Sequence, residues 1–507
     1  MSPLRGSNDA NLCGVRGSIR KANSILPSPT FEDTTLGEVT SHPLHLPRTR
    51  RLNFFALVGV MFFIVCGGAY GLEALVGAVG PGWAVVLVIA TPLLWSLPIA
   101  LMVAELSSAM PREGGYYVWV RTALGNFWAV QEGWWTCCYM VVDLAIYPVL
   151  FINYLAFFVP ALRLDESGAT SFNAGLMRWL IAAGVIAASL AINWRGAKAV
   201  GSSSLLNLAI VIVPFILLIV FAFVHSGAVG STVSIVGTDL RSNHSAKLLA
   251  LGLGTVLWNY MGWDNTSTFA GEVNEPQRNY PRGIIVALPL TIAAYLLPTL
   301  AGISATTDKN LWSESQGWPQ IAQLIGGRWL GITLAVAALF SAWSLFNGQL
   351  LYVSRLPYAM AMDRWLPSPL ARVSKTTGVP RVSLLVSCAV AALLSAMSFG
   401  KLVVIDVLLY SAALSLEFAA LIILRWKRPG FPRPFRIPGG WVGVALVTIA
   451  PMLCAVLLVI VSLSGEDADP KQALIVIFVI ISGIGLYFAR KKHARSGRNP
   501  TVREGAG

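Results

Sequence analysis

The chain has 507 residues, of which 55% are hydrophobic and only 12% are charged. Soluble domains carry roughly 25% charged residues, so this composition excludes a water-soluble protein of this size. The net charge of +13 could indicate nucleic-acid binding, but the placement of the basic residues along the chain indicates a membrane topology instead.

Long apolar runs recur along most of the chain. Residues 1–50 are polar and rich in Ser, Pro and Arg, which predicts a disordered cytoplasmic tail without a secretory signal peptide. Residues 51–489 are predicted to form one transmembrane domain, since a span needs about 20 apolar residues, and 490–507 a basic cytoplasmic tail. Twelve spans are predicted, at 53–79, 84–108, 127–159, 179–193, 203–224, 248–270, 284–305, 329–353, 382–399, 402–424, 441–464 and 472–489.

Lysine and arginine are distributed unevenly between the two sides that these spans define. If the N-terminus is cytoplasmic, 29 of the 37 basic residues lie in the tails and loops of that side and 8 on the other. The positive-inside rule therefore predicts that both tails are cytoplasmic. The basic excess indicates topology and contact with anionic lipid, and no nucleic-acid partner is expected.

Two predicted spans are interrupted near their middles. Span 1 contains Gly67-Gly68-Ala69-Tyr70-Gly71 followed by Glu73, and span 6 contains Gly262-Trp263-Asp264. Glycine weakens a helix by about 1 kcal/mol, and the backbone groups it frees need partners within the membrane. Paired breaks at corresponding places predict two repeats, about 53–224 and 248–424, with a binding site at the midplane and trailing helices over 441–489. A glycine-rich helix crossing is the alternative interpretation.

Acidic residues occur in or at the ends of several spans, whereas no lysine or arginine lies well inside one. The seven are Glu73, Glu105, Glu132, Asp143, Asp264, Asp406 and Glu417. We expect them to lack fixed cationic partners, and a buried carboxylate is costly unless it is paired or protonated. Intramembrane ionisable residues are functional candidates by default. The set therefore predicts a cationic substrate, proton coupling, or both.

The positions of the seven acidic residues along their spans distinguish their expected roles. Asp143 lies near the middle of span 3, and Trp135, Tyr139 and Tyr147 recur around it at every fourth residue, on one drifting helix face. A cation–π contact with an aromatic ring stabilises a desolvated ammonium by about 2 kcal/mol. An aromatic stripe on a helix, however, more often belongs to the packed core. The predicted substrate-binding residues are Gly67, Gly68, Ala69, Tyr70, Gly71, Glu73, Tyr139, Asp143, Gly262, Trp263, Asp264, Trp343 and Asn347.

Some of the acidic residues are candidates for a second role, and the others are assigned different ones. The proton-coupling candidates are Glu73, Asp143, Asp264 and Glu417. Glu105 and Glu132 lie near cytoplasmic span ends, which favours a structural or gating role, and Asp406 is expected near the outer surface, exposed to solvent. We expect no metal and no cofactor. The spans contain no His-rich cluster, nucleophile elbow or Cys–His pairing, so an enzyme is not expected.

Three motifs, taken in order, resemble the amino acid–polyamine–organocation superfamily over roughly 50–440. They are Ala104-Glu105-Leu106 with Pro111–Tyr117 after span 2, Gly271–Pro276 with Asn279–Gly283 after span 6, and Ser354–Ala361 with Leu366-Pro367 after span 8. The resemblance implies an all-α integral membrane fold of about twelve helices. That fold is a five-plus-five inverted repeat with broken helices 1 and 6, plus two trailing helices.

Within the superfamily the chain looks most like the plant-type polyamine uptake family, close to the L-type amino acid transporters. Amino acid carriers usually cradle a carboxylate at the span-1 break, but here Glu73 and Asp264 follow the two breaks, which favours an ammonium. The resemblance implies polyamine uptake by proton symport and alternating access at the plasma membrane. An L-type-like carrier of neutral or cationic amino acids, and a channel or nutrient receptor, remain alternatives, and a partner subunit stays open.

Overall fold

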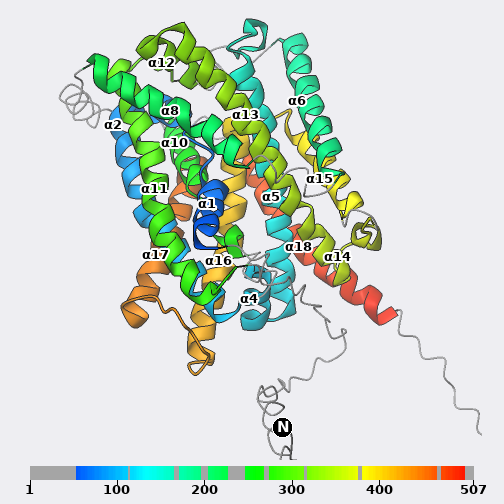
Figure 1. The fold of residues 1–507 in the computed structure, drawn as a ribbon. Helices are drawn as coiled ribbons and strands as arrows, with labels where there is room; N and C mark the ends of the chain where they lie inside the picture. The colour runs from blue at the N-terminus through cyan, green and yellow to red at the C-terminus, as the bar shows by residue number, and fades with distance from the viewer. Residues whose placement is uncertain are drawn as a thin grey trace, which may run out of the picture. The chain divides into compact units, whose positions relative to one another are not determined.

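The structure is a computed structural model that describes residues 53–111, 115–164, 171–195, 204–226, 246–267, 273–312, 317–374, 379–464 and 470–496. Within these ranges the chain is helical and forms no β-strand, which confirms the all-α expectation (Figure 1). The predicted N-terminal tail and residues 497–507 of the C-terminal tail lie outside the described residues.

The helices are arranged along the chain in the following order. Their bounds are α1 (Phe54–Val65), α2 (Glu73–Thr91), a π-helical turn (Pro92–Ser96), α3 (Leu97–Ala109), α4 (Gly115–Leu124), α5 (Asn126–Leu155), α6 (Phe172–Asn193), α8 (Ser204–Ser226), α10 (Ala246–Asn259), α11 (Pro276–Ala305), α12 (Gly317–Gly326), α13 (Arg328–Val353), α14 (Arg355–Met362), α15 (Arg381–Leu394), α16 (Phe399–Lys427), α17 (Gly440–Leu463) and α18 (Pro470–Ser496).

Eight helical stretches among the described residues are long and apolar enough to cross a membrane, which makes the chain a multi-span membrane protein. They are α2 to α3 taken together, α5, α6, α11, α13 continued by α14, α16, α17 and part of α18. Two other predicted spans correspond to shorter apolar helices, in α8 and α15. The remaining two are the interrupted spans 1 and 6, so the count of twelve stays a prediction.

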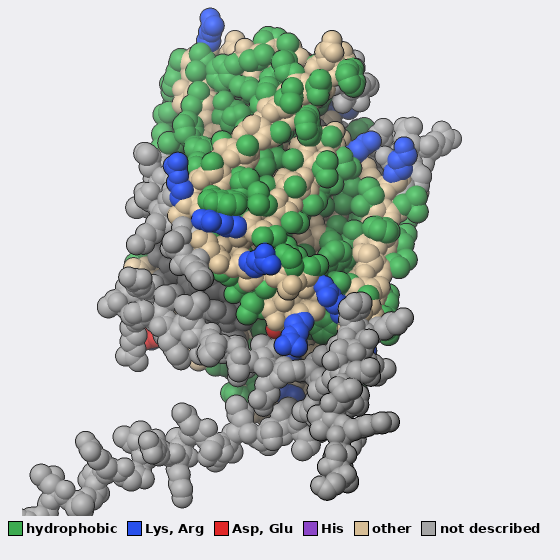
Figure 2. Space-filling view, turned by 90° about the vertical axis from the view of Figure 1, so that its right-hand side faces the viewer, with side chains coloured by type: hydrophobic (Ala, Val, Ile, Leu, Met, Phe, Trp, Pro, Cys, Tyr) green, Lys and Arg blue, Asp and Glu red, His purple; other side chains and the backbone are tan. Residues whose placement is uncertain are grey.

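The surface suits a lipid environment. Figure 2 shows a face on which hydrophobic side chains predominate and acidic side chains are scarce. α18 is among the most exposed helices, and its Phe478 is 72% exposed. Large apolar side chains on the outside of a helix bundle are stable when they contact lipid, because the bilayer core is itself apolar.

Both predicted interruptions are present. α1 ends at Val65 and α2 begins at Glu73, with Gly68 and Gly71 between them at φ +91° and +85°. α10 ends at Asn259, and Gly262 follows at φ +94°. Positive φ is readily available to glycine alone, which explains why these residues stop the two helices.

Side chains satisfy the backbone groups that the interruptions expose. The carbonyl of Gly67 accepts a hydrogen bond from Ser341 Oγ at 2.7 Å, and that of Ala69 accepts one from Trp318 Nε1 at 2.6 Å. At the second break, Ser96 Oγ donates to the carbonyl of Tyr260 at 2.9 Å. Unsatisfied backbone groups cost several kcal/mol in a membrane, so these distant donors are what makes the breaks tolerable.

A local structural unit occurs twice. α4 and α12 each have 10 residues; Gly125 (φ +87°, ψ −176°) separates α4 from α5, and Gly327 (φ +81°, ψ −179°) separates α12 from α13. α4 and α12 also begin at glycines with positive φ, Gly115 and Gly317. The offset is 202 residues at both ends (317 − 115 and 327 − 125). This repetition supports an internal repeat, whose predicted boundaries and inversion stay predictions.

One acidic residue has the cationic partner that we did not expect. Arg425 binds Glu105 with two nitrogens, the Nε–Oε1 distance being 2.7 Å, and Arg433 Nε lies 3.5 Å from Glu105 Oε1. The backbone N–H of Ile437 also donates to Glu105. The prediction of unpaired carboxylates is therefore wrong for Glu105. The pair could not be predicted from the sequence, because Arg425 lies 320 residues from Glu105, at the end of α16.

Candidate functional site

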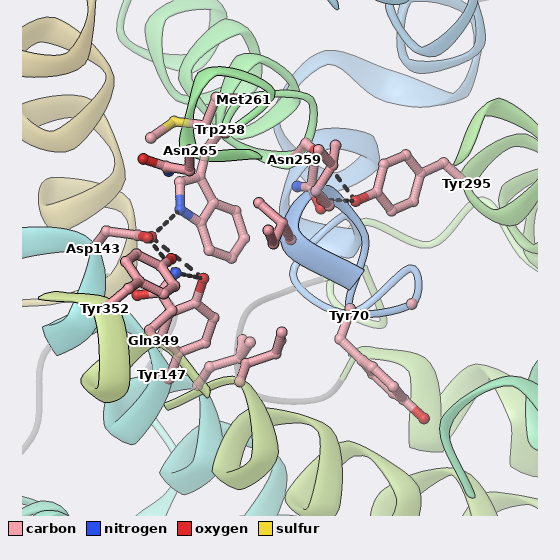
Figure 3. A pocket seen from close by; sticks show the side chains of 17 residues that line it. Tyr70, Asp143, Tyr147, Trp258, Asn259, Met261, Asn265, Tyr295, Gln349 and Tyr352 are labelled. Atoms are coloured by element: carbon pink, nitrogen blue, oxygen red, sulfur yellow. Dashed lines mark hydrogen bonds between the residues drawn. The ribbon is translucent and has the colours of Figure 1, made fainter. Parts of the chain in front are cut away.

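A pocket lies between the two helix interruptions, and α5, α11 and α13 complete its wall (Figure 3). It contains about 550 Å³ of space between protein atoms, part of it continuous with solvent. The lining residues are Ile64, Val65, Gly67, Gly68, Tyr70, Asp143, Tyr147, Leu150, Trp258, Asn259, Met261, Gly262, Asn265, Tyr295, Leu345, Gln349 and Tyr352. The two interrupted helices thus meet at this pocket, where a binding site is expected in proteins with paired helix breaks.

Asp143 is the acidic side chain in this wall. It is 8% exposed, and its Oδ1 accepts hydrogen bonds from Trp258 Nε1 at 2.8 Å and from the Tyr147 hydroxyl at 3.4 Å. Its Oδ2 accepts one from Gln349 Nε2 at 2.5 Å. All three donors are neutral, and they come from three different helices (Figure 3). The carboxylate is therefore oriented and hydrogen-bonded, but these bonds do not cancel its charge.

The ends of two helices add to the negative potential of the pocket. The carboxyl ends of α1 and α10 are at Val65 and Asn259, and both residues line the pocket. The Tyr295 hydroxyl lies 2.9 Å from the carbonyl oxygen of Val65 and 2.8 Å from that of Asn259. Because a helix carries about half a negative charge at its carboxyl end, this arrangement favours a bound cation over an anion.

Aromatic rings surround the carboxylate. The rings of Tyr147 and Trp258 are 6.2 Å apart, and Trp258 also packs edge-on against Phe399 at 5.6 Å. Tyr352 lies on the same side of the pocket as Asp143, whereas the hydroxyl of Tyr70 points away from that group (Figure 3). A carboxylate among aromatic faces can hold an ammonium by charge and by cation–π contact together.

The structure brings five of the predicted substrate-binding residues to the pocket: Gly67, Gly68, Tyr70, Asp143 and Gly262. The others lie elsewhere in this conformation. Ala69 and Trp263 are fully buried outside the pocket wall. Tyr139 donates a hydrogen bond to Asn265 Oδ1 at 3.2 Å. Whether any of these residues binds a substrate stays a prediction.

The span-8 candidates face another helix. Trp343 Nε1 and Asn347 Nδ2 each donate to Ser189 Oγ of α6 at 3.1 Å, and Asn193 Nδ2 donates to Asn347 Oδ1 at 3.0 Å. These hydrogen bonds join α13 to α6. Neither Trp343 nor Asn347 lines the pocket in this conformation.

Glu73 begins α2 behind the first break. The Tyr154 hydroxyl donates to Glu73 Oε1 at 2.7 Å and accepts a hydrogen bond from the backbone N–H of Gly71 at 2.9 Å. A negative charge at the start of a helix is favourable, because unsatisfied N–H groups gather there. Glu73 therefore stabilises the second half of span 1, and it does not line the pocket.

The other predicted proton-coupling residues are buried beyond the pocket. Asp264 Oδ1 accepts a hydrogen bond from the Tyr410 hydroxyl at 2.6 Å, and Glu417 is 1% exposed within α16. The expectation that Asp406 is solvated near the surface is wrong, since it is 0% exposed. Its position near the start of the predicted span suggested a surface, but α16 is packed against α5 and α10.

Several pocket residues were not predicted as site residues. Gln349, Tyr352, Asn259 and Tyr295 are in the lining. Polar side chains within spans 6, 7 and 8 were a usable signal for Gln349, Asn259 and Tyr295, because a buried polar group needs a partner. The sequence does not show which of the many span residues turn toward the pocket.

Comparison with known proteins gives a consistent result. The model of the amino acid permease family matches residues 52–487. The chain is 33% identical over 462 residues to the polyamine transporter PUT1 of Oryza sativa subsp. japonica, covering 90% of this chain and 82% of that protein. It is 32% identical over 478 residues to the polyamine transporter RMV1 of Arabidopsis thaliana, covering 93% and 92%. An uncharacterized transporter of Mycobacterium bovis is 31% identical over 306 residues, with 58% and 62% covered.

Proposed function

The chain belongs to the amino acid permease family, and from this membership we propose that it takes up polyamines such as spermidine, spermine and putrescine, with similar organic cations. The observation that supports this cargo is the buried Asp143, whose hydrogen-bond donors are all neutral. An ammonium group supplies the missing positive charge, and hydrogen bonds between charged groups are roughly twice as strong as neutral ones.

The rest of the pocket suits the rest of such a molecule. The carboxyl ends of α1 and α10 attract a second positive charge. Tyr147, Trp258 and Tyr352 present apolar ring surface to the methylene groups between charges. The names of the relatives from Oryza sativa and Arabidopsis thaliana agree with this cargo.

Transport proceeds in this proposal by alternating access around the two breaks. Glu73, Tyr139, Trp263, Asp264, Trp343 and Asn347 do not line the pocket in the present conformation. Any contact of theirs with the substrate therefore belongs to another conformation of the cycle. Interrupted helices suit such motion, because half-helices can move around a fixed site.

Proton symport is part of the proposal, although the membrane potential alone is a strong driving force. Each positive charge gains about 2.3 kcal/mol per 100 mV, so a tricationic polyamine gains ~7 kcal/mol, or about five decades of accumulation. A uniporter is thus energetically sufficient. The resemblance to the polyamine uptake family favours symport at the plasma membrane, with both termini cytoplasmic.

Uptake of labelled spermidine tests the cargo. The protein is expressed in cells that lack polyamine transport, with excess unlabelled putrescine, leucine or arginine as competitor. We expect saturable uptake that putrescine blocks and the two amino acids do not. Entry of leucine or arginine instead, with no spermidine uptake despite surface expression, would establish an amino acid carrier and refute the polyamine proposal.

A further inference from the structure

The two helices α5 and α16 carry the same three side-chain types in reverse order. On α5 the order is Glu132, then Tyr139 seven residues later, then Asp143 four residues later. On α16 the order is Asp406, Tyr410 after four residues, and Glu417 after seven. With 3.6 residues per turn, intervals of four and seven keep all three side chains on one face of each helix.

The packing of the helices aligns the two sets. The rings of Tyr139 and Tyr410 meet edge-to-face, with centroids 5.2 Å apart and an interplanar angle of 89°. In an antiparallel pair this central contact places Asp143 opposite Asp406, and Glu132 opposite Glu417. Electrostatics agrees, because Asp406 lies within range of the Asp143 charge, and Glu417 within range of the Glu132 charge. We call this double row of six residues the α5–α16 seam.

Three of the four seam carboxylates, all except Asp143, have buried oxygens without a hydrogen bond. Asp406 is 0% exposed, and neither of its carboxylate oxygens has a hydrogen bond. One oxygen each of Glu132 and Glu417 is also buried without a hydrogen bond. In the part of the chain that the structure describes, no ion pair involves a seam carboxylate; those at Glu105 and Glu275 lie elsewhere.

Four such groups cannot all be charged. Removing an ion from water costs several kcal/mol even after relaxation, and two carboxylates that share a site do not both ionise. The titratable groups that face the first pair, Asp143 and Asp406, are the hydroxyls of Tyr147 and Tyr352, and the neutral donors Trp258 and Gln349 also bind Asp143. The second pair, Glu132 and Glu417, faces Thr136, Tyr116 and the further acid Asp264. None of these neighbours brings a positive charge.

We propose that the α5–α16 seam is the proton site of this transporter, beside the substrate pocket and separate from it. Asp406 holds a proton next to the anionic Asp143, which is left to bind ammonium, and Glu132 and Glu417 share another proton. The Asp406 proton stays in place, and the proton that Glu132 and Glu417 share is the one transported: it is taken up at a carboxylate oxygen on one side of the membrane and leaves from the same oxygen on the other. The inference rests on the proposed function in one respect, that a cation is the cargo.

Two hydrogen bonds connect the seam to the second helix interruption. The Tyr410 hydroxyl donates to Asp264 at 2.6 Å, and that of Tyr139 donates to Asn265 at 3.2 Å. Both acceptors belong to the second interruption, and Asn265 also lines the pocket. A rearrangement of this break therefore changes the surroundings of the second pair, which couples proton release to the conformational change.

Purified protein in liposomes provides the test, with Glu417→Gln and Asp406→Asn as variants. Accumulation of labelled spermidine is measured at clamped membrane potential while the pH gradient is varied. For one coupled proton, a gradient of one pH unit changes the accumulation ratio about tenfold. We expect this dependence in the wild type and less than a twofold change in Glu417→Gln, which still exchanges substrate at equilibrium.

Ser415→Ala is the matched control. Ser415 is on α16, but its hydroxyl donates to the Ala412 carbonyl of its own helix at 2.6 Å, away from the seam. This variant is expected to keep the wild-type pH dependence. Wild-type dependence in Glu417→Gln would overturn the proposal.

A second measurement does not depend on transport, and its deciding outcome is read from the wild-type protein alone. Infrared spectroscopy detects protonated carboxyl groups directly, and we expect their band in the wild-type protein at neutral pH, with part of it lost in Asp406→Asn. A wild-type spectrum without any protonated-carboxyl band would also overturn the proposal. If the cargo is an amino acid and not spermidine, the proposed function fails, and the gradient experiment with that amino acid still decides the seam.

Discussion

Asp143→Asn is the sharpest test of the pocket, because it removes the charge and hardly changes the shape. The new amide group would face Gln349 Nε2, a donor against a donor, where Oδ2 now accepts a hydrogen bond at 2.5 Å. Gln349 Oε1 has no hydrogen bond at present, so rotation of the Gln349 amide by half a turn restores one. We therefore expect the variant to fold and to keep the pocket.

Its substrate affinity should nevertheless fall steeply. Truncating one partner of a buried, hydrogen-bonded charge pair costs about 2–5 kcal/mol. At ~1.4 kcal/mol per decade, the dissociation constant for spermidine should rise from about 30-fold to several thousand-fold. The lower figure applies if water enters the pocket and replaces part of the lost interaction.

The assay is binding of labelled spermidine to the purified protein, with thermal unfolding as the check on folding. Asp308→Asn is the matched control, since it makes the same chemical change at an exposed residue that caps the turn at Asn310. We expect the control to bind as the wild type does. A folded Asp143→Asn protein that binds spermidine within threefold of the wild type would refute the charge-pairing argument.

Two further predictions concern single contacts. Trp258→Phe keeps an aromatic ring but removes the indole N–H that donates to Asp143. Hydrogen bonds to charged groups are worth about 1.5–3 kcal/mol. Competition binding should therefore show that the affinity for spermidine falls by about tenfold or more. Glu105→Gln leaves Arg425 without its buried partner, which should destabilise the fold by about 3–5 kcal/mol and lower the midpoint of thermal unfolding in detergent. The control Glu275→Gln breaks only an exposed 4.0 Å pair and should shift that midpoint little; equal shifts in the two variants would contradict the assignment of Glu105 as a structural residue.

Much of the architecture could be predicted from the sequence, because the membrane imposes rules that act locally along a chain. Apolar length predicts a span, and a glycine-rich interruption predicts a break wherever the freed backbone can find partners. Both interruptions are present as predicted, at Gly67–Gly71 and around Gly262. Asp143, which lines the pocket, was among the sequence candidates because a carboxylate in the middle of an apolar span is exceptional; that it binds the substrate stays a prediction.

Other features depend on which helix faces meet, and local pattern does not report that. Asp406 has the same sequence signature as a solvated residue at a span end, yet the packing of α16 buries it completely. Glu105 has a partner 320 residues away, and Asp264 lies behind the pocket against Tyr410.

The reversed order of acids and tyrosines on α5 and α16 illustrates the difference between what the sequence predicts and what the packing decides. It is visible in the sequence, but it has no meaning until the contact between Tyr139 and Tyr410 sets the antiparallel register. Hydrophobicity and helix breaks are properties of consecutive residues, so the sequence by itself was enough to predict a multi-span helical membrane protein, the two interruptions and the acidic candidates. The pairing of side chains on separate helices depends on their packing in three dimensions, and only the tertiary structure decided which carboxylate lines the pocket and which are buried beside it.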